Sequence, residues 1–250
     1  MQQIKRLYRS TYSGESVVKN LTYANNTWTP ELELVPNNVF NTHTTTQAAV
    51  IGNGESRANF DLNLVVKHVA GLGGIDSLQT YGCNALYRDY TPDFLVAVGE
   101  DIVREIAESN YCTDNIVYAN ADYLLTYSNR FYLIPQNLYL DSGAVAAYMA
   151  CFDGHKKVFL LGFDSYDETG PYNNIYKGTN GYQLTDKLHS NVFFTQSLHS
   201  VMTTYSDVEF VRVMPEATWW AHDQHNVLPN FRQINYKDFV LEADLGLLAA

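Results

Sequence analysis

Asp141 to Tyr172 reads DSGAVAAYMACFDGHKKVFLLGFDSYDETGPY, and this stretch decides the fold. The Ala-rich segment that opens at Ser142 predicts a buried helix, because Ala is the best helix former and the segment has no charged residues. A turn over residues 153–155 follows. The apolar run Val158–Leu161 then predicts a buried strand. A helix that leads into a buried strand is typical of an α/β protein with a parallel sheet.

The carboxyl end of this strand is a candidate ligand site. Gly162 and Asp164 follow the strand directly, and a polar loop then carries Tyr166 and Tyr172. In an open α/β sheet, ligands bind outside the carboxyl ends of the strands. We also expect the helix start at Ser142 to point free backbone N–H groups at an anion.

A second motif combines a strand with a glycine turn. The β run Ala48–Ile51 is followed by the turn Gly52-Asn53-Gly54-Glu55-Ser56, which predicts a strand, a tight turn and a helix. Glycines let the backbone approach a ligand closely. The third Gly of the dinucleotide fingerprint is missing, because Arg57 stands in that place, so NAD is disfavoured. A plain tight turn is the alternative to a ligand-binding loop.

Strands and helices alternate through the rest of the chain. Helices are predicted over residues 60–70, 99–109 and 189–203, and strands over 77–83, 93–98, 116–119 and 208–213, the last strand of the chain. Residues 120–140 are aromatic and are expected to be irregular. Asn84, at the end of the 77–83 strand, either contacts a ligand or caps the strand end. The pattern predicts an α/β fold with a Rossmann-like, mostly parallel sheet flanked by helices, and a lid-like loop over residues 165–190.

The N-terminal part of the chain differs from the rest. Residues 1–46 are polar and rich in Asn and Thr, and only Val17-Val18 and Leu32–Val35 are patterned as short edge strands. We therefore expect residues 1–46 to be an extension packed on a single domain that spans residues 47–250.

The composition limits the class of function. The 250 residues carry a net charge of −11, which weighs against a nucleic-acid-binding surface, because such a surface needs basic residues. The 3 cysteines have no CxxC spacing and suggest neither a disulfide framework nor a zinc site. The N-terminus lacks an apolar signal sequence and no segment stays apolar for about 18 residues. We therefore expect a cytoplasmic protein without a transmembrane segment, and leave peripheral membrane association open.

Several motifs, in the same order, resemble those of the small bacterial sialyltransferases of glycosyltransferase family 42. The resemblance covers residues 48–215. The similar segments are Gly52-Asn53-Gly54-Glu55-Ser56 (Gly-Asn-Gly-Pro-Ser in the family), Cys83-Asn84-Ala85-Leu86-Tyr87 (Cys-Asn-x-x-Tyr), the helix start Ser142-Gly143, Gly162-Phe163-Asp164-Ser165-Tyr166 with Tyr172 (Gly-x-Asp-x-Tyr and a second Tyr), and His189-Ser190 (His-Ser).

The resemblance implies a metal-independent, inverting glycosyltransferase that takes a CMP-activated, sialic-acid-like sugar and a glycan acceptor. His189 would be the general base, and Tyr166 and Tyr172 would donate hydrogen bonds to the phosphate leaving group. The residues that would hold the nucleotide and the donor sugar are Gly52, Asn53, Gly54, Ser56, Asn84, Ser142, Gly143, Gly162 and Asp164. It implies no cofactor and no metal, and it allows a homo-oligomer, because small transferases of this kind often oligomerise.

The chain also departs from this family. Tyr139 stands where the family has an Arg, and Glu100 and Asp101 stand where it has an Asn after the third strand. A more distant resemblance, to the Rossmann-like archaeal pterin pyrophosphokinases, rests on Thr91-Pro92-Asp93 and Gly162-Phe163-Asp164. It implies Mg²⁺-dependent diphosphate transfer to a small molecule, with Glu100 or Asp101 holding the metal. A nucleotide-binding protein without catalysis is the third alternative.

Overall fold

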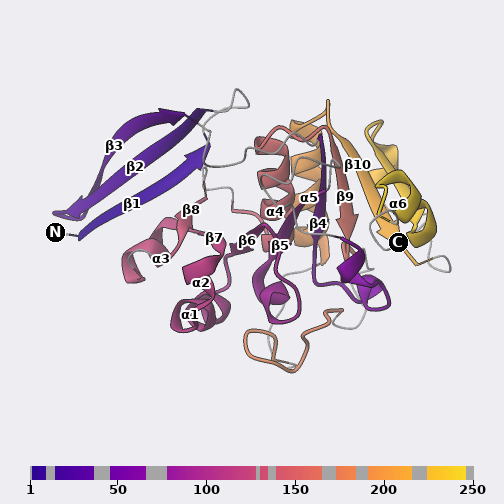
Figure 1. Cartoon of the computed structure of the whole chain (residues 1–250), viewed down its shortest axis with the longest axis horizontal. Coiled ribbons are helices and arrows are strands. Elements are labelled where there is room, and N and C mark those ends of the chain that lie inside the picture. Colours follow the sequence, from indigo (N-terminus) through magenta and orange to yellow (C-terminus); the bar gives the residue numbers. More distant parts are fainter. Residues whose placement is uncertain are drawn as a thin grey trace.

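The computed structural model of the chain describes residues 2–9, 15–36, 46–65, 78–127, 130–134, 139–164, 173–183, 191–215 and 224–245. Its centre is a sheet of the eight strands β4 (Gln47–Ile51), β5 (Gln79–Cys83), β6 (Phe94–Ala97), β7 (Ile116–Ala119), β8 (Tyr132–Leu133), β9 (Lys157–Leu161), β10 (Glu209–Met214) and β11 (Phe231–Asn235). The order in space is β11-β10-β9-β4-β5-β6-β7-β8, and all neighbouring pairs are parallel. The predicted Rossmann-like α/β fold is confirmed (Figure 1).

Helices cover both faces of this sheet. The α-helices are α1 (Glu100–Glu108), α2 (Tyr111–Asp114), α3 (Ala121–Thr126), α4 (Ser142–Phe152), α5 (Asn191–Thr204) and α6 (Tyr236–Glu242), and the 3-10 helices are η1 (Glu55–Arg57), η2 (Leu62–Leu64), η3 (Asn84–Arg88) and η4 (Gln224–Val227). Val158 and Leu160 of β9 pack in the same cluster as α4 and α5, whereas Phe159 and Leu161 pack in that of α6. Because both faces are covered, a central strand such as β9 is an unbroken apolar run in the sequence.

Two predictions at the edges of the sheet are wrong. Residues 120–140, expected to be irregular, contain α3 and β8. The strand predicted over residues 208–213 is β10, but it is not the last, because β11 pairs with it in parallel. The β11 sequence FRQIN has no apolar run, since β11 is an edge strand and is buried at only two of its positions.

Some predicted elements reach outside the described residues. Of the helix predicted over residues 60–70, the part up to residue 65 holds only the 3-10 helix η2, and residues 66–77 are not described. Of the lid-like loop, residues 173–183 are described and form consecutive turns. Within the described ranges, no helix is both long enough and apolar enough to cross a bilayer.

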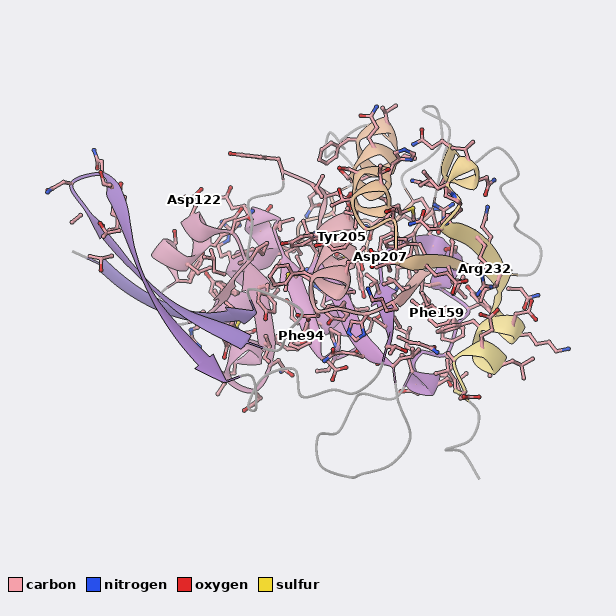
Figure 2. The ribbon with its side chains drawn as sticks, turned by 90° about the horizontal axis from the view of Figure 1, so that it is seen from above. Phe94, Asp122, Phe159, Tyr205, Asp207 and Arg232 are labelled. Carbon is pink, nitrogen blue, oxygen red and sulfur yellow. The ribbon has the colours of Figure 1, made fainter. Side chains whose placement is uncertain are left out.

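The N-terminal residues form a second, antiparallel sheet, with strands β1 (Gln2–Arg9), β2 (Glu15–Ala24) and β3 (Thr27–Pro36). The expected short edge strands are therefore wrong, because β2 is central and both β2 and β3 have 10 residues. Asn25 and Asn26 have φ values of 52° and 58°, the left-handed pair of a tight hairpin turn. This sheet lies beside the main body, where β1 contacts β8 and α3; Asp122 marks α3 in Figure 2.

The connection between β4 and β9 defines the geometry of the fold. The chain runs from β4 outward through β5, β6, β7 and β8, and then returns to place β9 on the other side of β4. This reversal makes the carboxyl ends of β4 and β9 the topological switch point, where doubly wound sheets bind their ligands.

Two glycine turns meet at this switch point. The N–H groups of Gly52 and Gly54 donate to the carbonyl oxygens of Leu161 and Gly162, at 2.7 and 2.9 Å. Gly162 has a φ of +68°, and a Cβ atom there would lie 2.8 Å from the Gly52 carbonyl oxygen. Glycine is therefore required here because the two turns contact each other. This packing role agrees with the alternative in which the Gly-x-Gly motif is a plain tight turn.

A comparison of two glycine variants tests this contact. Gly162→Ala adds a backbone clash to an unfavourable left-handed φ, so we expect it to lower the free energy of unfolding by ~2–4 kcal/mol. Gly178 is the matched control, because its φ is +81° but a Cβ atom there would meet nothing within 4 Å. Gly178→Ala should lower it by only ~1 kcal/mol. Urea unfolding curves measure both, and equal losses would contradict the close contact.

Candidate functional site

The candidate site lies at the carboxyl ends of β9, β4 and β5 and at the start of α4. The predicted binding residues are all in the described part of the chain, at these ends: Gly52, Asn53, Gly54, Ser56, Asn84, Ser142, Gly143, Gly162 and Asp164. The predicted catalytic residues Tyr166, Tyr172 and His189 lie outside the described residues, and their roles stay predictions.

The side chain of Asn53 is buried, with 8% of its surface exposed. Its Nδ2 donates to the carbonyl oxygen of Cys83 at 3.3 Å and to the hydroxyl of Tyr182 at 3.1 Å. Its Oδ1 is buried and has no hydrogen-bond partner among the described residues. A buried polar atom of this kind usually meets a water or a ligand, because leaving it unpaired costs about 1–3 kcal/mol.

Ser56 presents a second buried oxygen. Its backbone is held on both sides, since its N–H donates to Asp164 Oδ2 at 2.9 Å and its carbonyl accepts from the hydroxyl of Tyr236. The Ser56 Oγ is buried and likewise has no hydrogen-bond partner in the described ranges. The turn after β4 therefore carries two oxygens whose hydrogen-bonding capacity these residues do not use.

Asn84 and Ser142 are joined to each other. Asn84 Nδ2 donates to Ser142 Oγ at 3.0 Å, and Asn84 Oδ1 accepts from the N–H of Val98 at 3.1 Å. The φ of Asn84 is 46°, a left-handed conformation that Asn tolerates better than most residues. The neighbouring thiol of Cys83 donates to the Ile51 carbonyl at 3.8 Å, and burial raises its pKa to about 12. Asn84 thus links the ends of β5 and β6 to the start of α4. This role agrees with the alternative in which Asn84 caps the strand end.

The start of α4 is already occupied by a carboxylate. Asp141 Oδ1 accepts from the N–H groups of Gly143 and Ala144 at 2.9 and 3.1 Å. The expectation that these N–H groups are free is therefore wrong, and an anion would have to displace Asp141. An Asp just before a helix is a strong capping signal in the sequence, and Asp141 is the N-cap of α4. Gly143 stays small because a Cβ atom there would lie 3.1 Å from Phe163 Cε1.

Arg57 is a functional candidate that sequence reasoning missed. It is 4% exposed, and its Nε donates to the Gly52 carbonyl at 2.6 Å. Its guanidinium also donates to the hydroxyl of Tyr176 at 3.1 Å and lies 4.0 Å from the carboxylate of Asp89. A buried cation beside the glycine turn favours a negatively charged ligand. Its sequence position, directly after a predicted ligand-binding turn, is the signal that could have found it.

The loop over residues 173–183 lies next to the turn after β4. The N–H of Ile175 donates to the carbonyl of Asn53 at 2.9 Å, and Asn173 Oδ1 accepts from the N–H of Glu55 at 2.6 Å. Lys177 forms an ion pair with Glu55. This part of the predicted lid is therefore bonded to the domain by backbone and side-chain contacts.

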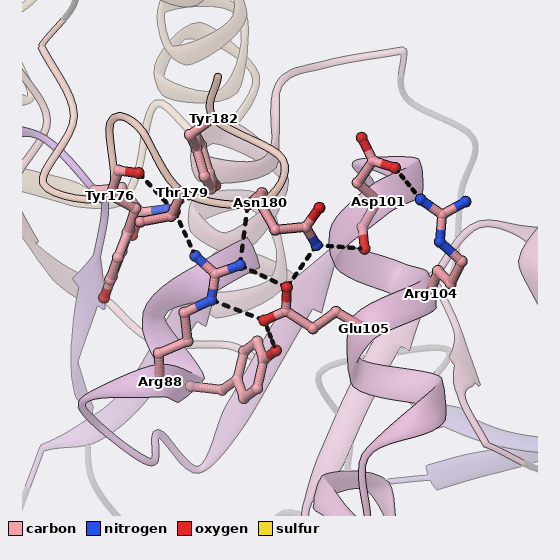
Figure 3. Close-up of polar contacts among 10 residues, drawn as sticks. Arg88, Asp101, Arg104, Glu105, Tyr176, Thr179, Asn180 and Tyr182 are labelled. Atoms are coloured by element: carbon pink, nitrogen blue, oxygen red, sulfur yellow. Dashed lines mark hydrogen bonds and ion pairs between the residues drawn. The ribbon is translucent and has the colours of Figure 1, made fainter. Parts of the chain in front are cut away.

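Glu100 and Asp101 lie in the first turn of α1 and are exposed. The Asp101 carboxylate pairs with Arg104, one turn further along the helix (Figure 3). Among the residues that the structure describes, no group of three or more His, Cys, Asp or Glu is placed to hold a metal ion. Tyr139 is 83% exposed.

Comparisons with protein-family models, curated proteins and solved structures found no match to this chain. The fold and the site define a doubly wound, Rossmann-like α/β protein with buried polar groups at the switch point of its sheet.

The carboxylate of Asp141 gives a pH-dependent prediction. Burial raises the pKa of Asp141 from 3.8 to about 6, although its hydrogen bonds with Ala144, Gly143 and Ser197 act to lower it. The folded protein therefore binds this proton more tightly than the unfolded chain, and the stability from this group is lost as pH rises from 3.8 through about 6. Asp141→Asn keeps a cap but cannot ionise. It should raise the free energy of unfolding by ~1–3 kcal/mol at about pH 7.5, and by less at about pH 4. Urea unfolding at both pH values measures this, and equal effects would contradict it.

Proposed function

We propose that this protein is a metal-independent, inverting glycosyltransferase that moves a sialic-acid-like sugar from CMP to a glycan acceptor. The observation that carries the proposal is the pair of buried oxygens, Asn53 Oδ1 and Ser56 Oγ, at the switch point of the sheet. These residues belong to the motif that resembles the donor-binding turn of the sialyltransferase family. The proposal includes a cytoplasmic location and a homo-oligomeric state.

A nucleotide suits these two oxygens. Asn53 Oδ1 can only accept a hydrogen bond, so it needs an N–H or O–H donor such as an amine or a ribose hydroxyl. Ser56 Oγ can both donate and accept, so it suits a phosphate or a sugar oxygen. Each bond would remove the unfavourable burial of an unpaired oxygen, and binding would gain that free energy.

The charge around the turn also supports an anionic nucleotide. Arg57 is a buried cation whose only ion pair within the described residues is the long contact to Asp89, at 4.0 Å. A phosphate-containing donor would thus meet a positive charge in a site of low dielectric constant, where charge interactions are strong.

The proposed reaction uses Tyr166, Tyr172 and His189, which come after β9 in the sequence. The acceptor hydroxyl gives its proton to His189 and its oxygen bonds to the anomeric carbon of the sugar. The bond from that carbon to the phosphate oxygen breaks, and CMP leaves with the electron pair. The hydroxyls of Tyr166 and Tyr172 donate hydrogen bonds to the phosphate as its negative charge develops. Attack opposite the leaving group inverts the anomeric centre.

The competing functions differ in their ligands. Mg²⁺-dependent diphosphate transfer would use Glu100 or Asp101, but Asp101 is engaged by Arg104. The features in favour of that function are the two acidic residues and the motifs Thr91-Pro92-Asp93 and Gly162-Phe163-Asp164. A nucleotide-binding protein without catalysis would share the binding site and show no turnover.

Calorimetric titration tests the binding step. We expect CMP to bind in the presence of EDTA, and Ser56→Ala to weaken this binding by ~5–10-fold, because about one hydrogen bond is lost. The same variant should leave the unfolding midpoint unchanged or slightly raised, since it removes a buried hydroxyl without a described partner. Binding of ATP only with Mg²⁺ would favour diphosphate transfer, and binding of no nucleotide would overturn the proposal.

The tyrosine roles make a separate prediction. The double variant Tyr166→Phe with Tyr172→Phe should release CMP from CMP-sialic acid at least ~10²-fold more slowly, because the leaving phosphate loses its two donors. Its far-UV circular dichroism spectrum should match that of the wild type. Wild-type turnover in a folded double variant would rule out the assigned roles. Absence of turnover in the wild-type protein that binds CMP would point to the non-catalytic alternative.

A further inference from the structure

Hydrogen bonds between its own backbone groups hold the loop over residues 173–183 in its conformation. The N–H of Gly178 donates to the carbonyl of Tyr182 at 2.8 Å, and the N–H of Tyr182 donates to the carbonyl of Thr179 at 3.0 Å. Tyr182 is 8% exposed, and its ring packs against Tyr176 with centroids 6.0 Å apart. At Gly181 a Cβ atom would lie 2.7 Å from Ile102 Cδ1, so the loop backbone rests directly on α1.

A cluster of polar side chains holds this loop to the domain (Figure 3). We call it the clasp, and it consists of Arg88, Glu105, Thr179 and Asn180. Arg88 forms a two-bond pair with Glu105, at 2.8 and 2.7 Å, and also donates to Thr179 Oγ1 at 2.7 Å and to the Asn180 carbonyl at 3.0 Å. Asn180 Nδ2 donates to Glu105 Oε2 at 2.6 Å. The clasp therefore fixes loop residues that are bonded to Tyr182.

The ionisation of Glu105 strengthens the clasp. Burial acts to raise the pKa of this carboxyl, but hydrogen bonds from Arg88, Tyr87 and Asn180 lower it to about 2. The carboxylate is therefore charged over the whole range in which the protein would work. Charged, two-bond Arg–carboxylate pairs are among the strongest and most directional contacts in proteins.

Cys83 determines how the amide of Asn53 is turned, and Tyr182 helps to hold it in that orientation. The backbone carbonyl of Cys83 can only accept, so the Asn53 atom that faces it must be the NH₂ group. The same NH₂ group donates to the Tyr182 hydroxyl, which is the shorter of the two bonds. Both donors of the amide are thereby used, and its Oδ1 is buried without a hydrogen-bond partner among the described residues.

We propose that Tyr182 is a positioning residue, which the clasp holds in place, and that its hydroxyl keeps the Asn53 amide in the orientation set by Cys83, with Oδ1 left for the ligand. This inference rests on the proposed function and adds a specificity to it. The site would select a ligand that offers an N–H or O–H donor at this point, such as the amine of cytosine. A uracil nucleotide, which has a carbonyl at the place of that amine, would be disfavoured there.

Side-chain amide signals in a ¹H–¹⁵N NMR spectrum test the positioning directly. The Asn53 pair is assigned as the one missing from Asn53→Asp. In Tyr182→Phe we expect this pair to shift and to exchange faster with solvent, because only the 3.3 Å bond to Cys83 remains. CMP should bind ~5–10-fold more weakly, and its preference over UMP should shrink. Unchanged Asn53 signals would overturn the proposal.

Two further variants separate positioning from general loss of structure. Tyr90→Phe is the matched control, since it removes a tyrosine hydroxyl that donates to the Val65 carbonyl, away from Asn53. It should leave the Asn53 signals and CMP binding as in the wild type. Glu105→Gln removes the charge of the clasp and should move the Asn53 signals in the same direction as Tyr182→Phe. If it does not, the role of the clasp is refuted.

The outcome is distinguishable from a failure of the proposed function. If the wild-type protein binds no CMP, the proposed function is overturned, and the Asn53 amide signals still decide whether Tyr182 orients that side chain. If CMP binds but Tyr182→Phe binds it with wild-type affinity and selectivity, the proposed function stands and the positioning role is rejected.

Discussion

The contact between two glycine turns is the constraint on which the rest of the structure depends. Gly52 and Gly162 follow adjacent parallel strands, and their backbones lie so close that neither position has room for a side chain. This contact joins the ends of β4 and β9 at the switch point of the sheet. It also sets the direction of the segment that follows each of these strands. One of them leads to Ser56 and Arg57, and the other to Asp164.

The polar groups around this contact mostly satisfy one another. Asn84 bonds Ser142, Asp141 caps α4, and Asp164 accepts from the backbone of Ser56. Such internal pairing lets a polar edge stay folded without a ligand, because buried polar groups are tolerated when they are hydrogen-bonded. Asn53 Oδ1 and Ser56 Oγ have no hydrogen-bond partner among the described residues, and we propose that a ligand contacts the edge there.

Much of the fold could be predicted because burial leaves a local signal. The strands β4, β6, β7 and β9 and the helices α1 and α4 agree with the predicted elements, since strands covered on both faces need continuous apolar residues. β5 also agrees with its prediction, although its sequence QTYGC is not an apolar run. The edge elements could not be predicted in this way. β11 is only partly buried and so needs few apolar residues, and the long hairpin of β2 and β3 depends on Asn25 and Asn26, a turn signal that was not used.

The sequence by itself determined the α/β class and named the turn residues at the carboxyl ends of the strands, because periodicity and glycine turns are local properties. Only the tertiary structure decided what each polar side chain does. It joined Asn84 to Ser142 across 58 positions and Asn53 to Tyr182 across 129. It also placed the Asp141 carboxylate on the N–H groups expected to be free. Hydrogen bonds depend on distances between atoms, and strand order and helix packing set those distances for residues far apart in the chain.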